Sequence, residues 1–197
     1  MPSMIATAVQ SSFLKAAANL TAQLAARWNA KGPQPLLDVQ RLVEFATYGF
    51  IGANMNYLFQ HWLERAFPTH GKVIPKVSAS DDDIKPEMPV PAVTDEAHSG
   101  INWRNIVWKV VLDQTVGFLV MIVVFLFITN VARVPHLVLI LEVWKQKIWG
   151  LLKAGWTIWP AVAVINYLWV PVRSRVLVGA CVGFGWNIFL SIVSMAR

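Results

Sequence analysis

The residues best suited to chemistry in this sequence are a few polar side chains inside long apolar stretches. Lys109, Asp113 and Gln114 interrupt the apolar run over residues 105–129. Lys109 and Asp113 stand four residues apart, so on a helix they share a face and can partly neutralise each other. A carboxylate inside a membrane span points to a water-filled path or a buried partner. Two roles follow for these residues: the wall of a polar conduit, or a structural ion pair that locks a bundle.

A second group of polar residues interrupts the C-terminal apolar stretches. Asn166 and Asn187 lie within them, and Arg173 and Arg175 lie between them. Amides at membrane depth need partners, and an interhelical hydrogen bond there contributes about 1 kcal/mol. Such bonds are the simpler interpretation of the two asparagines, and pore-lining amides are the alternative. The candidate pore-lining or buried polar residues are Lys109, Asp113, Gln114, Asn166, Arg173, Arg175 and Asn187.

The residue pattern gives little support to enzymatic or metal chemistry. The four histidines are scattered without ligand spacing. Asp81, Asp82 and Asp83 lack the glycine and the terminal glutamate of a calcium loop. The lone Cys181 cannot form an internal disulfide, and no nucleophile motif or phosphate loop occurs. We therefore expect a protein that is not an enzyme and that holds no cofactor and no metal.

The composition is that of a membrane protein. Of 197 residues, 56% are hydrophobic and only 14% are charged, whereas soluble domains are about a quarter charged. The mean hydropathy is +0.50. The net charge of +6 comes from basic residues spread singly along the chain, as in the flanks of membrane helices. The lipid bilayer is therefore the expected partner, and nucleic acid is not.

Helical periodicity, caps and breakers divide the chain into helices. Apolar residues recur every three or four positions over residues 4–28, and Asp38 is a predicted N-cap of a helix that Pro68 stops. The other predicted helices are the clearest span 105–129, an interfacial helix over 134–150, and apolar helices over 156–172 and 176–195. We predict an all-α integral membrane bundle, a single domain over residues 1–197, with about four spanning helices plus interfacial amphipathic ones.

Small residues and prolines predict how the helices pack. Gly49, Gly52 and Ala53 stand in the middle of the second predicted helix, where small side chains let helices approach closely in lipid. Pro160 and Pro171 fall in the apolar C-terminal stretches. A proline inside a span removes a backbone hydrogen bond, so bends are expected at these two positions.

Residues 69–100 differ in kind from the rest of the chain. They hold three consecutive aspartates and four prolines. Such a sequence cannot bury a core. It predicts a disordered, acidic, proline-rich aqueous loop within the membrane domain.

The run WTIWPAVAVINYLWVPVRSRVLVGACVGFGWNIFLS over residues 156–191 carries a specific pattern. Trp-Pro is followed by Asn-Tyr, Val-Pro, an arginine, and Trp-Asn with Leu-Ser close behind. This order resembles the Mpv-seventeen / peroxisomal-membrane-protein-twenty-two family of small membrane proteins. Lys109 followed by Asp113-Gln114 resembles a second element of that family. The signature residues, taken as structural, are Trp156, Trp159, Pro160, Tyr167, Pro171, Trp186 and Ser191.

The resemblance implies an organelle membrane, with the peroxisomal membrane slightly ahead of the mitochondrial inner membrane. It also implies a pore-forming channel for small solutes or metabolites. The alternative is a non-conducting structural or sorting protein that organises the membrane or recruits partners. The sequence leaves the oligomeric state open, and a homo-oligomer is compatible with it.

Overall fold

A computed structural model describes most of the chain, namely residues 3–30, 32–33, 36–70, 100–134 and 136–195. Of Leu137 and residues 187–195 only the course of the backbone is described. The predicted aqueous loop therefore lies almost wholly outside the described residues and stays a prediction. Every regular element in the described part is a helix, which confirms the predicted all-α class.

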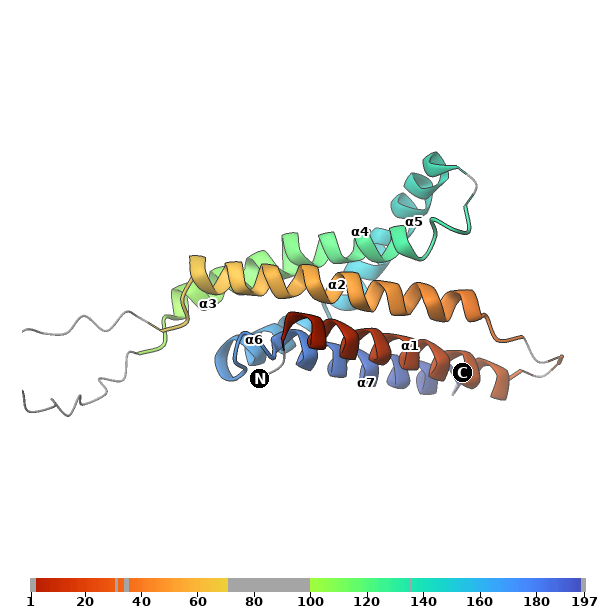
Figure 1. Ribbon diagram of the computed structural model, residues 1–197, viewed down its shortest axis with the longest axis horizontal. Helices are drawn as coiled ribbons and strands as arrows, with labels where there is room; N and C mark the ends of the chain where they lie inside the picture. Colours follow the sequence, from red (N-terminus) through yellow and green to blue (C-terminus); the bar gives the residue numbers. More distant parts are fainter. Residues whose placement is uncertain (1–2, 31, 34–35, 71–99, 135, 196–197) are drawn as a thin grey trace, which may run out of the picture.

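The helices follow one another in the order of Figure 1. They are α1 (Met4–Trp28), α2 (Val39–Ala66), α3 (Trp103–Leu112), the π-helical turn η1 (Asp113–Gly117), α4 (Phe118–Ile128), α5 (Leu137–Gly155), α6 (Trp159–Trp169) and α7 (Arg175–Met195). The predicted N-cap of α2 is confirmed, because an Asp38 carboxylate oxygen accepts a hydrogen bond of 2.9 Å from the backbone N–H of Arg41.

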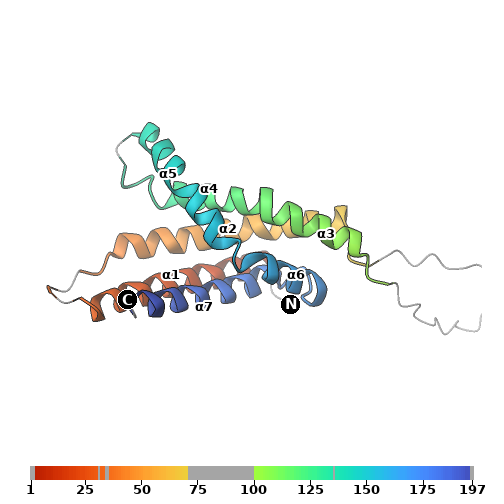
Figure 2. The ribbon, with the colours of Figure 1, turned by 180° about the vertical axis from the view of Figure 1, so that it is seen from behind.

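The bundle is built around two long hairpins of helices. α1 packs along both α2 and α7, and the rod formed by α3, η1 and α4 runs beside α2 (Figure 1). α2 runs in the opposite direction to α1, α7 and this rod in both ribbon views (Figure 2). α5 leaves the bundle at an angle and packs mainly on α4, whereas the short α6 returns to contact α3, η1 and α7.

α1 and α2 approach closely at Gly49. A Cβ added to Gly49 would lie 2.7 Å from the backbone oxygen of Ser11 and 2.7 Å from the Cα of Ser12. Next to this point the Ser12 hydroxyl donates a 2.8 Å hydrogen bond to the backbone oxygen of Ala46. The prediction that small residues allow close helix packing is confirmed here, because any larger side chain would meet backbone and not a movable side chain.

One helix is long and apolar enough to cross a membrane by itself among the described residues. It is the rod Trp103–Ile128, of 26 residues. Val138–Gly155 and Trp159–Trp169 would form a second span only if the pair, bent by 56°, crosses as one broken helix. The structure thus gives one clear candidate span, and the predicted count of about four does not follow from it.

The two C-terminal prolines mark helix ends. Pro160 stands in the first turn of α6, where the N–H that proline lacks would have no helical partner in any case. Pro171 follows Val170, the C-cap of that helix. The expected bends inside spans are therefore wrong: the 56° bend falls at the break between α5 and α6, before the proline ring could distort a helix interior.

Candidate functional site

The π-helical turn η1 places Asp113 and Gln114 in the interior of the bundle. The two oxygens of the Asp113 carboxylate each accept one amide hydrogen bond, 3.0 Å from Nε2 of Gln60 and 2.9 Å from Nε2 of Gln114. Gln60 Nε2 also donates to the Tyr167 hydroxyl at 3.3 Å. Asp113 therefore fixes the orientation of both glutamine amides, because their NH₂ groups must face a carboxylate that can only accept.

This arrangement leaves several buried oxygens without a hydrogen-bond donor in the described part of the chain. Besides Oγ1 of Thr7, which does not line the cavity, they are Oε1 of Gln60, Oε1 of Gln114, Oδ1 of Asn166 and Oγ of Ser11. Ser11, Gln60 and Gln114 are 3%, 6% and 9% exposed. Buried polar atoms normally have a partner, so these four oxygens give this region free hydrogen-bonding capacity for water or a ligand.

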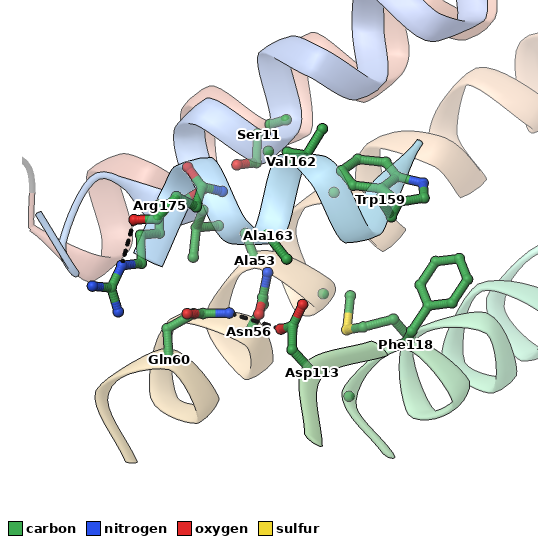
Figure 3. Close-up of a pocket in the computed structure, with 18 of the residues that line it drawn as sticks. Ser11, Ala53, Asn56, Gln60, Asp113, Phe118, Trp159, Val162, Ala163 and Arg175 are labelled. Carbon is green, nitrogen blue, oxygen red and sulfur yellow. Dashed lines mark hydrogen bonds between the residues drawn. The ribbon is translucent and has the colours of Figure 1, made fainter. Parts of the chain in front are cut away.

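The four oxygens belong to residues that line one cavity of about 160 Å³. Figure 3 shows the cavity between α1, α2, η1, α6 and α7, with Ser11, Gln60 and Asp113 around it. Lys15 of α1 and Arg175 of α7 also lie on its wall. Its apolar side includes Phe118 and Trp159. The cavity is therefore polar at one side and aromatic at the other.

A largely buried ionic cluster lies beside this cavity and connects α2, α3 and α7. We call it the Glu64 cluster: Glu64, Thr69, Lys109 and Arg175. Oε2 of Glu64 accepts from Nζ of Lys109 at 2.9 Å and from Nη1 of Arg175 at 2.7 Å, while its Oε1 accepts from the Thr69 hydroxyl at 2.7 Å. The Lys109 side chain is fully buried and that of Arg175 is 5% exposed. One carboxylate thus compensates two buried cations from two different helices.

The ring of Tyr167 lies against both cations of the Glu64 cluster. It is 2% exposed, and its ring lies 5.1 Å from Nζ of Lys109 and 4.9 Å from the guanidinium carbon of Arg175. Cations over an aromatic face gain further stabilisation when they are desolvated. Tyr167 also packs with Leu63, Ile106 and Ala163 in a core cluster that joins α2, α3 and α6.

A second ionic cluster lies at the other end of α2. We call it the Arg133 cluster: Arg133, Asp38 and Glu44. Nε of Arg133 donates to Glu44 at 2.8 Å, and its Nη2 donates to Asp38 at 2.9 Å. The backbone N–H of Arg41, followed by the Arg133 guanidinium, holds the pKa of Asp38 below its ordinary value, and hydrogen bonds with the two carboxylates raise the pKa of Arg133. Gln23 of α1 completes this end, because its amide bonds both the N–H and the C=O of Asp38 at 2.7 and 3.1 Å.

The structure brings most of the sequence-predicted site residues together. Asp113, Gln114, Asn166 and Arg175 line the cavity, and Lys109 lies in the adjoining Glu64 cluster. Two others stand apart, since Arg173 is exposed and the side chain of Asn187 lies outside the described residues. Whether any of them lines a conducting path stays a prediction.

Lys109 is not the partner that the spacing suggested for Asp113. Lys109 pairs with Glu64, and Asp113 is held by two glutamine amides. Helical side chains tilt toward the N-terminus of their helix, which directs the long Lys109 side chain away from Asp113 and toward the end of α2. The predicted Lys109–Asp113 ion pair is therefore wrong, because Lys109 pairs with an acid from a different helix.

Sequence reasoning missed several residues of the site. Glu64, Gln60 and Thr69 were not singled out, and neither were Ser11 and Lys15. Glu64 and Gln60 stand four residues apart in the last turns of α2, so they share a helix face. An acid and an amide on one face of α2 were the available signal.

The signature residues lie around the same region. Trp156 donates a 3.0 Å hydrogen bond from its indole nitrogen to the backbone oxygen of Gln114, and Trp159 lines the cavity. Pro160 and Pro171 mark the two ends of α6. Trp186 lies on α7, and the side chain of Ser191 lies outside the described residues. The C-terminal pattern therefore builds one wall of the cavity and the ends of the helix that carries it.

Comparison with known proteins finds sequence similarity over part of the chain. Residues 136–191 match the Mpv17 / PMP22 family. The chain is similar to Protein SYM1 of Yarrowia lipolytica, 47% identical over 47 residues that cover 24% of this chain and 23% of the relative. It is similar to PXMP2/4 family protein 2 of Dictyostelium discoideum, 33% identical over 47% of this chain and 48% of the relative. It is similar to the mitochondrial inner membrane protein Mpv17 of Caenorhabditis elegans, 34% identical over 33% of this chain and 40% of the relative.

These matches span less than half the length of each of the three relatives. No solved structure matches the chain significantly. The matched residues 136–191 include the C-terminal pattern from Trp159-Pro160 to Ser191. This C-terminal part of the chain is therefore similar to the Mpv17 / PMP22 family, and the relatives that it resembles include a mitochondrial inner membrane protein.

Proposed function

We propose that this protein forms a pore through which small solutes cross an organelle membrane. The observation that supports a pore best is the polar cavity of about 160 Å³ inside the bundle. Polar groups within a membrane bundle are costly unless they serve a path or a partner. Four buried oxygens at this cavity have no donor in the described part of the chain, which accords with a solute or water that passes through it.

The proposed topology has four full-length spans and one bent crossing made by α5 and α6, because α7 runs in the same direction as the rod and the chain must return between them. α1, α2, the α3–α4 rod and α7 have 25, 28, 26 and 21 residues, and about 20 residues are enough to cross the hydrocarbon core. The part of α5 around Glu142 and Lys145 is proposed to lie near the membrane interface, because both side chains are exposed beside the exposed Trp149. The peroxisomal membrane is our first choice of organelle, and imaging a tagged chain against peroxisomal and mitochondrial markers tests it.

A cavity-filling substitution tests the pore. Gly179 lines the cavity, and a Cβ at this position meets nothing within 4 Å. Gly179→Leu should therefore fill the cavity without a clash and lower solute release from proteoliposomes at least tenfold. Gly185→Leu is the matched control, because Gly185 lies on the same helix with open space around it and does not line the cavity. Wild-type vesicles that leak no faster than protein-free ones would contradict the pore.

The charge of Asp113 gives a second test. In Asp113→Asn the new amide cannot accept from two NH₂ groups, but one glutamine amide can turn over and accept from it instead. The fold should survive while one negative charge leaves the cavity wall. We expect the melting temperature in detergent to stay close to that of the wild type, and the ratio of anion to cation flux to rise severalfold.

The second candidate function is a non-conducting protein that organises the membrane or recruits partners. The Glu64 cluster favours it, because this cluster joins α2, α3 and α7 at one end of the cavity and makes the bundle rigid there. Neither proposal assigns an enzymatic activity. The Gly179→Leu experiment separates the two functions, since only a pore loses an activity when its cavity is filled.

A further inference from the structure

We propose that the cavity binds a small neutral solute rich in hydroxyl groups, of the size of a three-carbon polyol. The inference rests on the proposed pore, because it names the chemical class of solute that the pore accepts. It starts from the hydrogen-bonding capacity that the cavity wall leaves unused.

Within the described part of the chain, the buried atoms of the cavity wall that lack a hydrogen-bond partner are three amide oxygens and one hydroxyl group. Asp113 takes one amide from each glutamine, and so both NH₂ groups are occupied while both carbonyl oxygens are left over. Asn166 repeats this pattern, with its NH₂ group 3.5 Å from the backbone oxygen of Arg175 and its Oδ1 without a donor. The Ser11 hydroxyl on the opposite helix is also unpartnered. A matching ligand must therefore present several donors.

The charges on the wall disfavour a cationic ligand. Lys15 and Arg175 place two cationic groups at the cavity, and Lys109 adds a third in the adjoining Glu64 cluster. Asp113 and Glu64 supply only two carboxylates to these three cations. A cationic donor such as an ammonium ion would meet net repulsion, and an anion would face the amide oxygens and Asp113. Hydroxyl groups donate hydrogen bonds without a charge.

The size of the cavity sets the length of the solute. An engineered protein cavity of about 150 Å³ holds benzene, which has six heavy atoms. The cavity here is about 160 Å³. Glycerol also has six heavy atoms and carries three hydroxyl groups. The carbon chain can face the apolar side of the cavity, formed by Phe118 and Trp159, while the hydroxyl groups face the amide oxygens.

The test is a ligand-observed binding measurement on the full chain in detergent micelles. Saturation-transfer NMR suits weak binding, whereas melting temperatures do not, because polyols stabilise proteins by exclusion from their surface. Glycerol should give a saturable signal. 1,2-Propanediol has the same carbon chain with one hydroxyl fewer and should bind at least fivefold more weakly, and ethylammonium should not displace glycerol.

Two variants and one control locate the site. Ser11→Ala removes an oxygen that no described group bonds, so it should leave the melting temperature unchanged or raised while it weakens glycerol binding at least fivefold. Gln114→Met should weaken binding as well. Thr115→Val is the control, because Thr115 is exposed on the same turn, donates only to the backbone oxygen of Val111 and does not line the cavity.

The outcomes distinguish this inference from the pore itself. No saturable glycerol signal, equal binding of 1,2-propanediol, or stronger binding of ethylammonium overturns the polyol site. Unchanged glycerol binding in Ser11→Ala overturns it as well. Solute release from proteoliposomes is measured separately. Release without saturable glycerol binding would support the pore and contradict the polyol site. Saturable binding without release would support the site and contradict the pore.

Discussion

Glu64 is the residue on which two buried cations depend. Its carboxylate bonds Lys109 and Arg175 at 2.9 and 2.7 Å, and its own side chain is 28% exposed. A buried cation that loses its counter-ion keeps the full cost of its desolvation. The stability of this end of the bundle therefore rests on one acid that the sequence analysis did not single out.

Glu64→Gln should destabilise the protein by about 2–3 kcal/mol. That estimate lies at or below the lower end of what breaking a buried pair typically costs, because Glu64 is partly exposed. The measurement is the free energy of unfolding in mixed micelles. Glu142→Gln is the control, since Glu142 and its partner Lys145 are exposed on α5 and such pairs contribute little. Equal effects of the two substitutions would show that Glu64 faces ordinary water.

Asp38 predicts a response to acid. Its pKa is lowered by the hydrogen bond from the Arg41 N–H and by Arg133. A depressed carboxyl pKa stabilises the fold above the ordinary Asp value of 3.8, and this contribution is lost as pH falls through the lower, folded-state value. The wild-type melting temperature should therefore drop between about pH 5 and pH 3. Asp38→Asn, which can still cap α2, should show a smaller drop over the same range. An equal drop in melting temperature for the wild type and Asp38→Asn over this pH range would contradict the role of the Asp38 carboxylate.

At the residue scale the sequence predicted which polar groups are internal better than it predicted their partners. Asp113, Gln114, Asn166 and Arg175 could be found because polar atoms stand out in apolar runs. The Lys109–Glu64 pair could not, because its members are separated by 45 positions in the chain and the intervening segment is not helical in pattern. Spacing predicts neighbours within one helix, and contacts between helices depend on packing.

At the scale of elements, the contact between α1 and α2 sets how closely the bundle packs. Gly49 stands where the two backbones meet, and its neighbours there cannot move as a side chain can. Gly49→Ala should cost about 1–3 kcal/mol through overpacking. Gly150→Ala on exposed α5 has open space and should stabilise the protein by about 0.5–1 kcal/mol through helix propensity. Unfolding free energies of the two variants give the comparison, and a neutral Gly49→Ala would mean that the helices are farther apart.

Helix boundaries were predicted more closely than helix interiors. Residues 4–28 match α1, and the Asp38 cap and Pro68 bracket α2, because caps and prolines act locally. The π-helical turn η1 was not predicted. Its sequence, DQTVG, contains no proline and no feature that separates it from an α-helical turn. It arises where Asp113 and Gln114 meet Gln60 and Trp156 from other elements.

At the scale of the whole molecule, the outer surface is apolar. Phe13, Trp28 and Trp169 are 73%, 88% and 73% exposed. In a bilayer such side chains would face lipid, so their exposure would not cost hydrophobic free energy. Polar groups gather inside instead, which reverses the usual arrangement of a water-soluble bundle.

The single cysteine tests whether α7 spans the membrane. Cys181 is exposed on this helix, so in the proposed topology its thiol faces lipid. A charged maleimide should fail to modify it in open membrane fragments and should react rapidly after SDS is added. Gly100→Cys in a Cys181→Ser background is the control, because Gly100 is exposed at the edge of the predicted aqueous loop. Equally fast labelling of both thiols before SDS is added would show that α7 does not span the membrane.

The π-helical turn also has a meaning for insertions and deletions. A π-turn closes its hydrogen-bonded ring with one residue more than an α-turn, so η1 stores a single surplus residue inside an otherwise continuous rod. Removing Thr115 would let the rod close as an α-helix, with Lys109 still turned toward Glu64 and Phe118 still turned toward the cavity. Only Asp113 and Gln114 would lose their present orientation. The orientation of Asp113 and Gln114 in the cavity thus depends on one surplus backbone residue, so a one-residue deletion in this turn should change the lining while the flanking helices keep their register.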